Sequence, residues 1–361
     1  MNPDPIVRIE SVSKRFENVL ALDSLDLAIA PGQFLTLLGP SGCGKSTTLR
    51  LLGGFEQPDS GRILLGGEDV TRLPPNRRDV NMVFQDYALF PHMTVGQNVA
   101  FGLELKGQSR EQIAARSKEL FEFLQLTELA ARRPDQLSGG QRQRAALARA
   151  LAPDPKVLLL DEPLGALDAK LRSQVQVELK GIQQRTGKTF IFVTHDQEEA
   201  LTMSDRIVVM SEGRVMQDGT PEELYYHPQN RFVADFVGET NLLDCTVREE
   251  SGDDIVLDWR GTTLHARPHG GAMGLSAGQR VEVALRPESI QCFAGRPDLP
   301  NAVAGRITAR VFRGSRLSVT VAVGEGNDTL KASLDPFLGD HLEGEELWLG
   351  WRPERLAVLR G

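Results

Sequence analysis

Apolar residues in the first 235 positions fall into short continuous runs, with helically spaced segments between several of them. The runs that predict buried strands are QFLTLLG (33–39), VNMVFQ (80–85), VLLLDE (157–162), TFIFVT (189–194) and RIVVMSEG (206–213). The helical spacing covers residues 45–53, 110–126, 140–152, 168–186 and 196–203. Continuous apolar strands that alternate with helices predict a largely parallel α/β sheet covered on both faces.

The two ends of the chain show other patterns. IVRIESVSKRF (6–16) and LALDSLDLAIA (20–30) alternate with a period near two, which predicts an antiparallel sheet beside the main one. After residue 240 helical spacing fades, and short β-rich pieces lie between Gly, Pro and Asp turns. This texture predicts an all-β barrel or sandwich. We therefore expect two domains, 1–238 and 239–361, joined through residues 227–241.

Within the β-rich region, VALRPESIQCF (283–293) resembles LGWRPERLAVL (349–359). Each copy reads as a strand, an Arg-Pro-Glu turn and a second strand. The repeat predicts a duplicated small β unit. The alternative is that Arg-Pro-Glu is simply a recurrent turn.

Composition narrows the class of protein. The chain has 361 residues, which suits roughly two domains, and its formal net charge of −8 disfavours a nucleic-acid partner. The three cysteines, Cys43, Cys245 and Cys292, have no metal spacing and indicate a reduced, cytosolic protein. No N-terminal signal is visible, and apolar runs such as VLLL (157–160) are far shorter than the ~18 residues that span a bilayer. Any role at a membrane is therefore expected to come through a partner protein.

The segment GPSGCGKST (39–47) follows a predicted strand and opens a predicted helix, which is the context of a P-loop. Its glycines let backbone N–H groups surround a phosphate, Lys45 should reach the β- and γ-phosphates, and Ser46 should bind Mg²⁺. Cys43 lies near the helix start, where a thiolate is favoured, and is interpreted as a bystander. The nucleotide-binding residues expected in this loop are Gly39, Pro40, Ser41, Gly42, Cys43, Gly44, Lys45, Ser46 and Thr47.

Polar side chains follow three other predicted strands. Asp161 should complete the Mg²⁺ shell, and Glu162 stands where a carboxylate can polarise a water against the γ-phosphate, which favours ATP hydrolysis. His195 and Gln85 also end strands, where open α/β sheets bind ligands. We expect His195 to contact the γ-phosphate and Gln85 to contact Mg²⁺ and the attacking water. Taken alone, the histidine would be structural and the glutamine would carry little meaning.

Two further features, the segment 136–151 and Phe16, have no settled role from their local sequence alone. QLSGGQRQRAALARAL (136–151) places a serine and two glycines before a helix, which is a second phosphate cradle without a lysine. Phe16 precedes a turn-like stretch and is expected either to pack in the core or to stack on an adenine ring.

The P-loop, Gln85, LSGGQ, LLLDEP, GALD and His195, in this order, resemble the nucleotide-binding subunits of ABC transporters. The resemblance covers about residues 5–235 and implies an ABC ATPase domain with a mostly parallel sheet, an antiparallel β subdomain and a helical subdomain. It further implies a head-to-tail homodimer that holds two MgATP. Phe16 matches the adenine-stacking aromatic, which is usually a tyrosine, and Asp168 matches the loop that crosses to the partner. The residues that would reach the partner's ATP are Ser138, Gly139, Gly140 and Gln141.

An ATPase followed by an all-β, tandem OB-like, TOBE-like regulatory and dimerisation domain resembles one importer subclass. Residues 73–103 and GETNLL (238–243) look most like ATP-binding subunits of spermidine/putrescine importers; another solute of the subclass, such as a sugar or ferric ion, is the alternative. The resemblance implies two permease subunits, an external solute-binding protein and a peripheral place on the cytoplasmic face of the membrane. QDYALFPHMTV (85–95) concentrates apolar residues after Gln85 and predicts either a groove for a permease helix or a locally buried loop.

Three other classes of protein remain as rivals. A soluble ABC ATPase of DNA repair or translation usually has a coiled-coil insert or two ATPase domains, which this chain lacks, and its negative charge disfavours nucleic acid. A P-loop kinase or GTPase would have no use for LSGGQ. A purely structural protein would need neither the P-loop nor Glu162.

Overall fold

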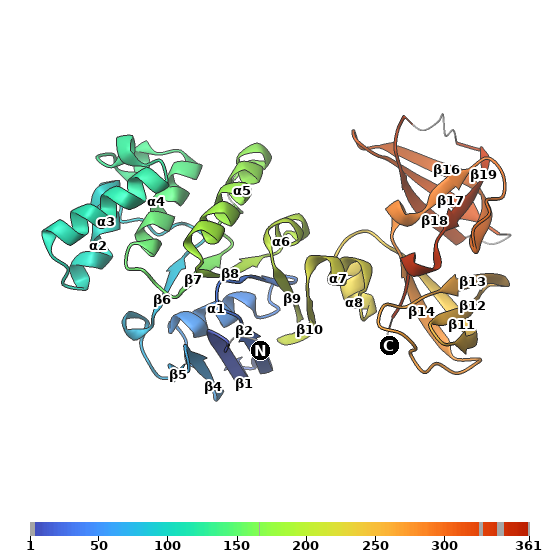
Figure 1. The fold of residues 1–361 in the computed structure, drawn as a ribbon, viewed down its shortest axis with the longest axis horizontal. Helices are drawn as coiled ribbons and strands as arrows, with labels where there is room; N and C mark the ends of the chain where they lie inside the picture. The colour runs from blue at the N-terminus through green and yellow to red at the C-terminus, as the bar shows by residue number, and fades with distance from the viewer. Residues whose placement is uncertain (1–3, 166, 325–327, 338–342, 360–361) are drawn as a thin grey trace. The chain divides into compact units, whose positions relative to one another are not determined.

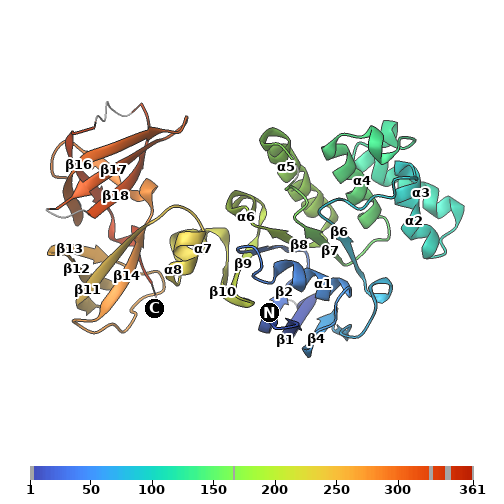
Figure 2. The same cartoon turned by 180° about the vertical axis from the view of Figure 1, so that it is seen from behind.

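The computed structural model describes residues 4–165, 167–324, 328–337 and 343–359. The chain divides into two compact units, residues 1–221 and 222–361. Figures 1 and 2 show the elements of each unit from opposite sides. The boundary between the two units lies at residues 221–222, earlier than the predicted domain boundary at 238. Helix α7 (Pro221–Tyr226) spans the start of the second unit, and α8 (Arg231–Phe236) lies within it. The functional division at 238 stays a prediction.

The described residues of the first unit form the expected largely parallel sheet, which has six strands in the order β10-β9-β3-β8-β7-β6; the sequence pattern predicts five of these strands and not β10. All neighbours in it are parallel except β10, which pairs antiparallel with β9. Its strands are β3 (Phe34–Leu38), β6 (Val80–Val83), β7 (Val157–Asp161), β8 (Thr189–Thr194), β9 (Arg206–Ser211) and β10 (Arg214–Gly219). The predicted strands are therefore confirmed, although β6 ends two residues before Gln85.

The apolar runs are continuous because both faces of this sheet are covered. Leu158 and Leu160 of β7 join a core cluster with the helices, whereas Val157 and Leu159 join a cluster with the antiparallel strands. Successive side chains of a strand point to opposite faces, so a strand buried on both faces is apolar at every position.

The N-terminal alternation gives the predicted antiparallel sheet, in the order β2-β1-β4-β5. Its strands are β1 (Val7–Phe16), β2 (Val19–Ile29), β4 (Ser60–Leu65) and β5 (Glu68–Asp69). The helices of the first unit are α1 (Lys45–Gly53), α2 (Val95–Leu105), α3 (Arg110–Phe123), α4 (Gly139–Leu151), α5 (Ala169–Thr186) and α6 (Gln197–Met203). α2, α3 and α4 gather into a helical subdomain (Figure 1), and α2 packs on both α3 and α4. Short 3₁₀ turns lie at Pro75–Arg77, Thr127–Leu129 and Pro134–Gln136.

The second unit is all-β after α8, as predicted, and consists of two antiparallel five-stranded sheets. One sheet has the order β13-β12-β11-β14-β20, and its strands are Thr262–Ala266, Asp254–Trp259, Asn241–Ser251, Arg280–Leu285 and Leu356–Val358. The other has the order β15-β19-β16-β17-β18, and its strands are Gln291–Phe293, Glu346–Trp351, Asn301–Phe312, Leu317–Val323 and Asp328–Leu334. The inner faces of both sheets supply one apolar core.

The internal repeat has a structural basis. Each Arg-Pro-Glu becomes a 3₁₀ turn, η4 (Pro287–Ser289) or η5 (Pro353–Arg355), between a long strand and a short one. The short strand after η4, β15, pairs with β19, and the short strand after η5, β20, pairs with β14. Each copy therefore completes the sheet of the other, which confirms a duplicated unit rather than a mere recurrent turn.

Candidate nucleotide site at the carboxyl ends of the parallel strands

The P-loop occupies the turn between the buried strand β3 and α1. Gly39 must be a glycine, because a Cβ there would lie 2.3 Å from the carbonyl oxygen of Met210 on β9. Gly44, directly before α1, has φ of 106°, and a Cβ there would lie 2.6 Å from the carbonyl oxygen of Ala21. Tight packing against two neighbours thus fixes the path of the loop, as the sequence pattern predicts.

Lys45 lies inside this loop. Its buried ammonium donates hydrogen bonds to the carbonyl oxygens of Gly39 at 2.7 Å and Pro40 at 2.9 Å. The loop therefore presents a fixed cation together with the first N–H groups of α1, an arrangement suited to phosphate.

The expectation that the helix start favours a Cys43 thiolate is wrong. The Cys43 side chain is buried, and this burial raises its pKa above the ordinary 9.0, although Lys45 opposes the rise. The low dielectric penalises the charged form more than the neighbouring Lys45 favours it. Cys43 is a packed thiol, which agrees with its interpretation as a bystander.

Two oxygen ligands suited to Mg²⁺ come together at the start of α1. The Ser46 hydroxyl donates to Asp161 Oδ1, at the end of β7, over 3.1 Å. Burial raises the pKa of Asp161, and the neighbouring Glu162 adds to the rise. A hard divalent cation would offset both effects, and hydroxyl and carboxylate oxygens are the donors that Mg²⁺ takes. These residues therefore fit the predicted metal.

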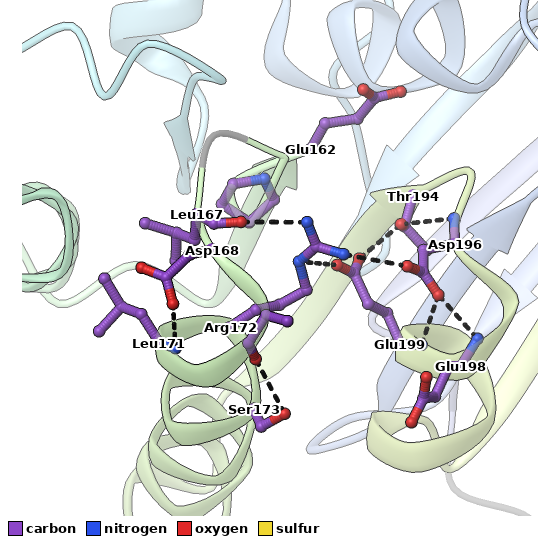
Figure 3. Close-up of polar contacts among 12 residues, drawn as sticks. Glu162, Leu167, Asp168, Leu171, Arg172, Ser173, Thr194, Asp196, Glu198 and Glu199 are labelled. Atoms are coloured by element: carbon purple, nitrogen blue, oxygen red, sulfur yellow. Dashed lines mark hydrogen bonds and ion pairs between the residues drawn. The ribbon is translucent and has the colours of Figure 1, made fainter. Parts of the chain in front are cut away.

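Glu162 and His195 face each other across the next strand end. The Glu162 amide donates to the Val193 carbonyl of β8 at 3.1 Å, and its φ is 44°, a left-handed conformation rare outside glycine. Glu162 Oε2 lies 3.4 Å from His195 Nδ1. The strained backbone turns the carboxylate toward His195, and in Figure 3 it points away from the cluster around Arg172. The predicted base and γ-phosphate ligand are thus neighbours.

Gln85 lies at the same edge, in an exposed turn after β6. A Cβ built on Gly165 would lie 3.9 Å from Gln85 Nε2, which places the amide beside the turn that follows Glu162. Tyr87 holds this segment in place by donating from its hydroxyl to the Pro163 carbonyl at 3.3 Å. The four predicted strand-end groups of one chain therefore converge, since β3, β6, β7 and β8 are parallel.

Phe16 ends β1 with an exposed ring, and Lys14 Nζ lies 5.0 Å from the ring centroid. Its exposure excludes the core-packing alternative. Stacking on adenine stays a prediction.

The second cradle has a different geometry. Ser138 caps α4: its hydroxyl accepts from the Gln141 amide at 3.4 Å, and its amide donates to Gln141 Oε1 at 3.0 Å. Within the described part of the chain, neither residue hydrogen-bonds to the P-loop. Gly139 and Gly140 form the first turn of α4, and Gly140 is buried against Leu171. One chain thus builds the cradle but does not complete a site with it.

Sequence reasoning missed a hub at Arg172, on the first turns of α5 (Figure 3). Its guanidinium donates to the Leu167 carbonyl at 3.1 Å and lies 3.4 Å from Asp196 and 3.7 Å from Glu199. Asp168 caps the same helix by accepting from the Leu171 amide at 3.0 Å. Arg172 therefore ties the GALD segment to the residues that follow His195; Ala166 of that segment lies outside the described residues.

One signal could have drawn attention to part of this hub. Asp196, two residues after the end of β8, is a helix-capping residue, and its carboxylate accepts from the amides of Glu198 at 2.9 Å and Glu199 at 3.2 Å. No sequence spacing joins Arg172 to Glu199, because the pair forms only when α5 packs on α6.

Comparisons with known proteins find matches to both units of the chain. The family model for the ABC transporter matches residues 22–165, and the TOBE domain model matches residues 283–359. A spermidine/putrescine import ATP-binding protein of Frankia alni is 50% identical over 98% of this chain and 79% of its own length. A protein of the same name from Pseudomonas fluorescens is 53% identical over 89% of this chain and 87% of its own. A solved dimeric ATP-binding cassette, bound to ADP and Pi, is 33% identical with a TM-score of 0.53, over 60% of this chain and 98% of that one.

Proposed function

Because the chain belongs to the family of ATP-binding subunits of ABC transporters, which are ATPases, we propose that it powers import of polyamines through a membrane permease. The observation that carries the ATPase part is the convergence of Lys45, Asp161 and Glu162 at one sheet edge. The polyamine part rests on the relatives, whose names specify spermidine and putrescine.

For hydrolysis, this chain positions and deprotonates the attacking water. Lys45 and the N–H groups at the start of α1 hold the phosphates, and Ser46 and Asp161 would hold Mg²⁺, which when bound neutralises charge on the phosphate oxygens. Glu162 accepts the proton from water, and His195 holds the γ-phosphate side of the site. Gln85 orients the water from the end of the neighbouring strand β6, at the same edge of the sheet.

The working unit is a head-to-tail homodimer. Among the described residues Ser138 and Gln141 hydrogen-bond to each other and not to the P-loop, so we assign Ser138 and the first N–H groups of α4 as the cap for the partner's ATP. Asp168 lies on the segment that crosses to the partner. Closure of two copies over two MgATP drives the permease outward-open, and hydrolysis resets it.

The permease docks on a groove next to Gln85. A cavity of about 480 Å³ lies there, lined among others by Phe55, Phe84, Phe90, Phe101 and Arg149. Of the apolar segment after Gln85, Tyr87 is buried, but Phe90 contributes to the groove. Arg149 of α4 donates to the carbonyls of Tyr87 at 3.0 Å and Ala88 at 2.6 Å, so the groove is tied to the LSGGQ helix. Among the described residues no helix is long and apolar enough to cross a membrane. On the basis of its relatives, which are import ATP-binding proteins, we place the chain peripherally on the cytoplasmic face, on two permease subunits served by an external solute-binding protein.

The half-site hypothesis predicts that Ser138→Arg abolishes ATP hydrolysis but leaves ATP binding to the monomer within about twofold. The chain offers a matched control, because Ser109 caps α3 with the same pair of hydrogen bonds to Gln112. Ser138→Arg and the control Ser109→Arg each remove a cap worth ~0.5–2 kcal/mol, but only Ser138→Arg should stop turnover. If the Ser138→Arg monomer lost its affinity for ATP, the LSGGQ segment would bind the ATP of its own chain. The proposed head-to-tail dimer, in which it caps the partner's ATP, would then be wrong.

Polyamine specificity is tested by uptake of labelled spermidine and putrescine in cells that lack this chain. Restoring the chain should restore uptake, and restoring Lys45→Ala should not. Uptake of a sugar measured in parallel should stay constant. If polyamine uptake is the same with and without the chain, and sugar or iron uptake appears only when the chain is present, the transported solute is a sugar or iron. The proposed ATPase activity would be unaffected by that result.

A further inference from the structure

The second unit contains a hollow with cationic walls that the ATPase function does not use. It is a cavity of about 420 Å³ between the residues after α7 and the two Arg-Pro-Glu turns. The residues that matter in its lining are Tyr226, His227, His269, Arg286, Arg352 and Arg355. A second cavity of about 310 Å³ shares Tyr226, Arg352 and Arg355 with it. We propose that these two neighbouring cavities, which share Arg352 and Arg355 in their walls, bind a small multivalent anion bearing phosphate or carboxylate groups.

The internal repeat brings two equivalent arginines to this place, and they have different roles. Arg286 is buried, and its Nη1 donates to the carbonyls of Ala234 at 2.9 Å and Gly238 at 2.8 Å, which closes the end of α8. Arg352 starts the other Arg-Pro-Glu turn but is exposed, and its side chain has no hydrogen bond or ion pair within the described residues. The duplication has thus left one arginine structural and the other available.

Arg355 adds a second available cation. Its guanidinium lies 5.4 Å from the centroid of the Tyr226 ring, which orients the side chain without neutralising it. Both Arg352 and Arg355 line both cavities. Two guanidiniums on one concave wall suit an oxyanion that can bridge them.

The carboxylates at this place are already engaged. Glu354 Oε1 lies 2.9 Å from Arg267 Nη1, and Glu288 accepts from the Tyr225 hydroxyl at 2.8 Å. Glu354 lines the larger cavity and Glu288 the smaller one, but among the described residues neither carboxylate forms an ion pair with Arg352 or Arg355. A cationic ligand such as a polyamine would meet the same two guanidiniums and be repelled.

Two buried side chains that line the cavities have N–H donors without a hydrogen-bond acceptor among the described residues. Arg286 Nη2 and the indole Nε1 of Trp351 are buried and have no hydrogen-bond partner within the described residues. Trp351 lines the smaller cavity, and Arg286 lines the larger one. A buried donor without an acceptor costs free energy, so both residues bring unsatisfied donors, and no unsatisfied acceptor, to the neighbourhood of the cavities.

The histidines support the same ligand class. The rings of His227 and His269 stack at 4.3 Å with an interplanar angle of 16°. Burial, followed by the neighbouring His269, lowers the pKa of His227 below its ordinary 6.5. A bound anion would offset this lowering at His227. The volume of the larger cavity lies within the range of small-molecule sites, about 300–1,000 Å³.

The test is a titration of the full chain with inorganic pyrophosphate and with citrate, in Mg²⁺-free buffer to weaken P-loop binding. Binding is followed by calorimetry and by the NMR resonance of the Trp351 indole N–H, assigned by its loss in Trp351→Phe. We expect saturable binding of at least one of the two anions with a shift of this resonance. Arg352→Gln or Arg355→Gln should each weaken it about tenfold, and both together about a hundredfold.

The matched control is Arg310→Gln, an exposed arginine of β16 outside both cavities, which should change the affinity less than twofold. The proposal is overturned if neither anion binds saturably, if the double variant binds as tightly as the unmodified chain, or if spermidine binds there instead. None of these outcomes affects the proposed ATPase, since Arg352 and Arg355 take no part in it.

Discussion

At the scale of single residues, the surroundings of a side chain determine its role more than its residue type does. Asp161 and Glu162 are adjacent carboxylates, yet one is buried against Ser46 and the other is turned toward His195 by a left-handed backbone. This difference separates a metal ligand from a base. Sequence spacing predicts that both matter, but the strained φ of Glu162 appears only in the fold.

Cys43 gives a prediction at this scale. Because burial raises its pKa, the thiol stays protonated at pH 8, and its sulfur is also shielded. Alkylation of Cys43 by iodoacetamide at pH 8 should be at least about tenfold slower in the native chain than in the chain unfolded in urea, as followed by mass spectrometry. If Cys43 were alkylated as fast in the native chain as in the unfolded chain, the result would support the thiolate that its place at the helix start predicts.

At the scale of elements, strands were predicted well and their connections poorly. The continuous apolar runs mark β3, β7 and β8 because each is buried on both faces. Helix α4 was placed within one residue, since LSGGQ carries its cap. The exchange of β15 and β20 between the two sheets could not be predicted, because pairing partners depend on three-dimensional packing rather than on local pattern.

The Arg172 hub belongs to this scale because it joins α5 to α6. Arg172→Ala should lower the ATPase rate about tenfold or more with an unchanged KM for ATP, since no contact with the phosphates is removed and only the placement of Asp168 and His195 suffers. Arg172→Lys should recover part of the rate. Lys170→Ala removes a charge from the same helical turn and should be neutral. A change in KM alone would exclude a positioning role.

The same variant has a predicted pH dependence. Burial raises the pKa of Glu199 above its ordinary 4.5, and Arg172 opposes the rise. A carboxyl group whose pKa is higher in the folded state than in the unfolded state destabilises the fold once it ionises. Its contribution to folding stability is lost as the pH rises from the unfolded-state pKa through the folded-state pKa. Without Arg172 the rise is larger, so the melting temperature of Arg172→Ala should fall further below that of the unmodified chain at pH 8 than at pH 5. An equal deficit at both values would mean that Glu199 is not the affected group.

At the scale of the whole molecule, two units carry separate cores. Calorimetry should therefore resolve two transitions. MgADP at about 100 times its Kd should stabilise only the transition of the first unit, by about 2.7 kcal/mol. In Lys45→Ala this shift should shrink strongly. A single transition that moves as a whole would show that the units unfold together.

The central claim is that Glu162 is the base for ATP hydrolysis. The most direct measurement is the steady-state MgATPase rate of purified Glu162→Gln, with Glu198→Gln, an exposed glutamate of α6, as the control. We predict that Glu162→Gln lowers the rate about 10²–10⁴-fold while ATP binding is retained, because the amide cannot accept the proton of water. Glu198→Gln should keep the full rate. Hydrolysis by Glu162→Gln at the unmodified rate would contradict the catalytic assignment.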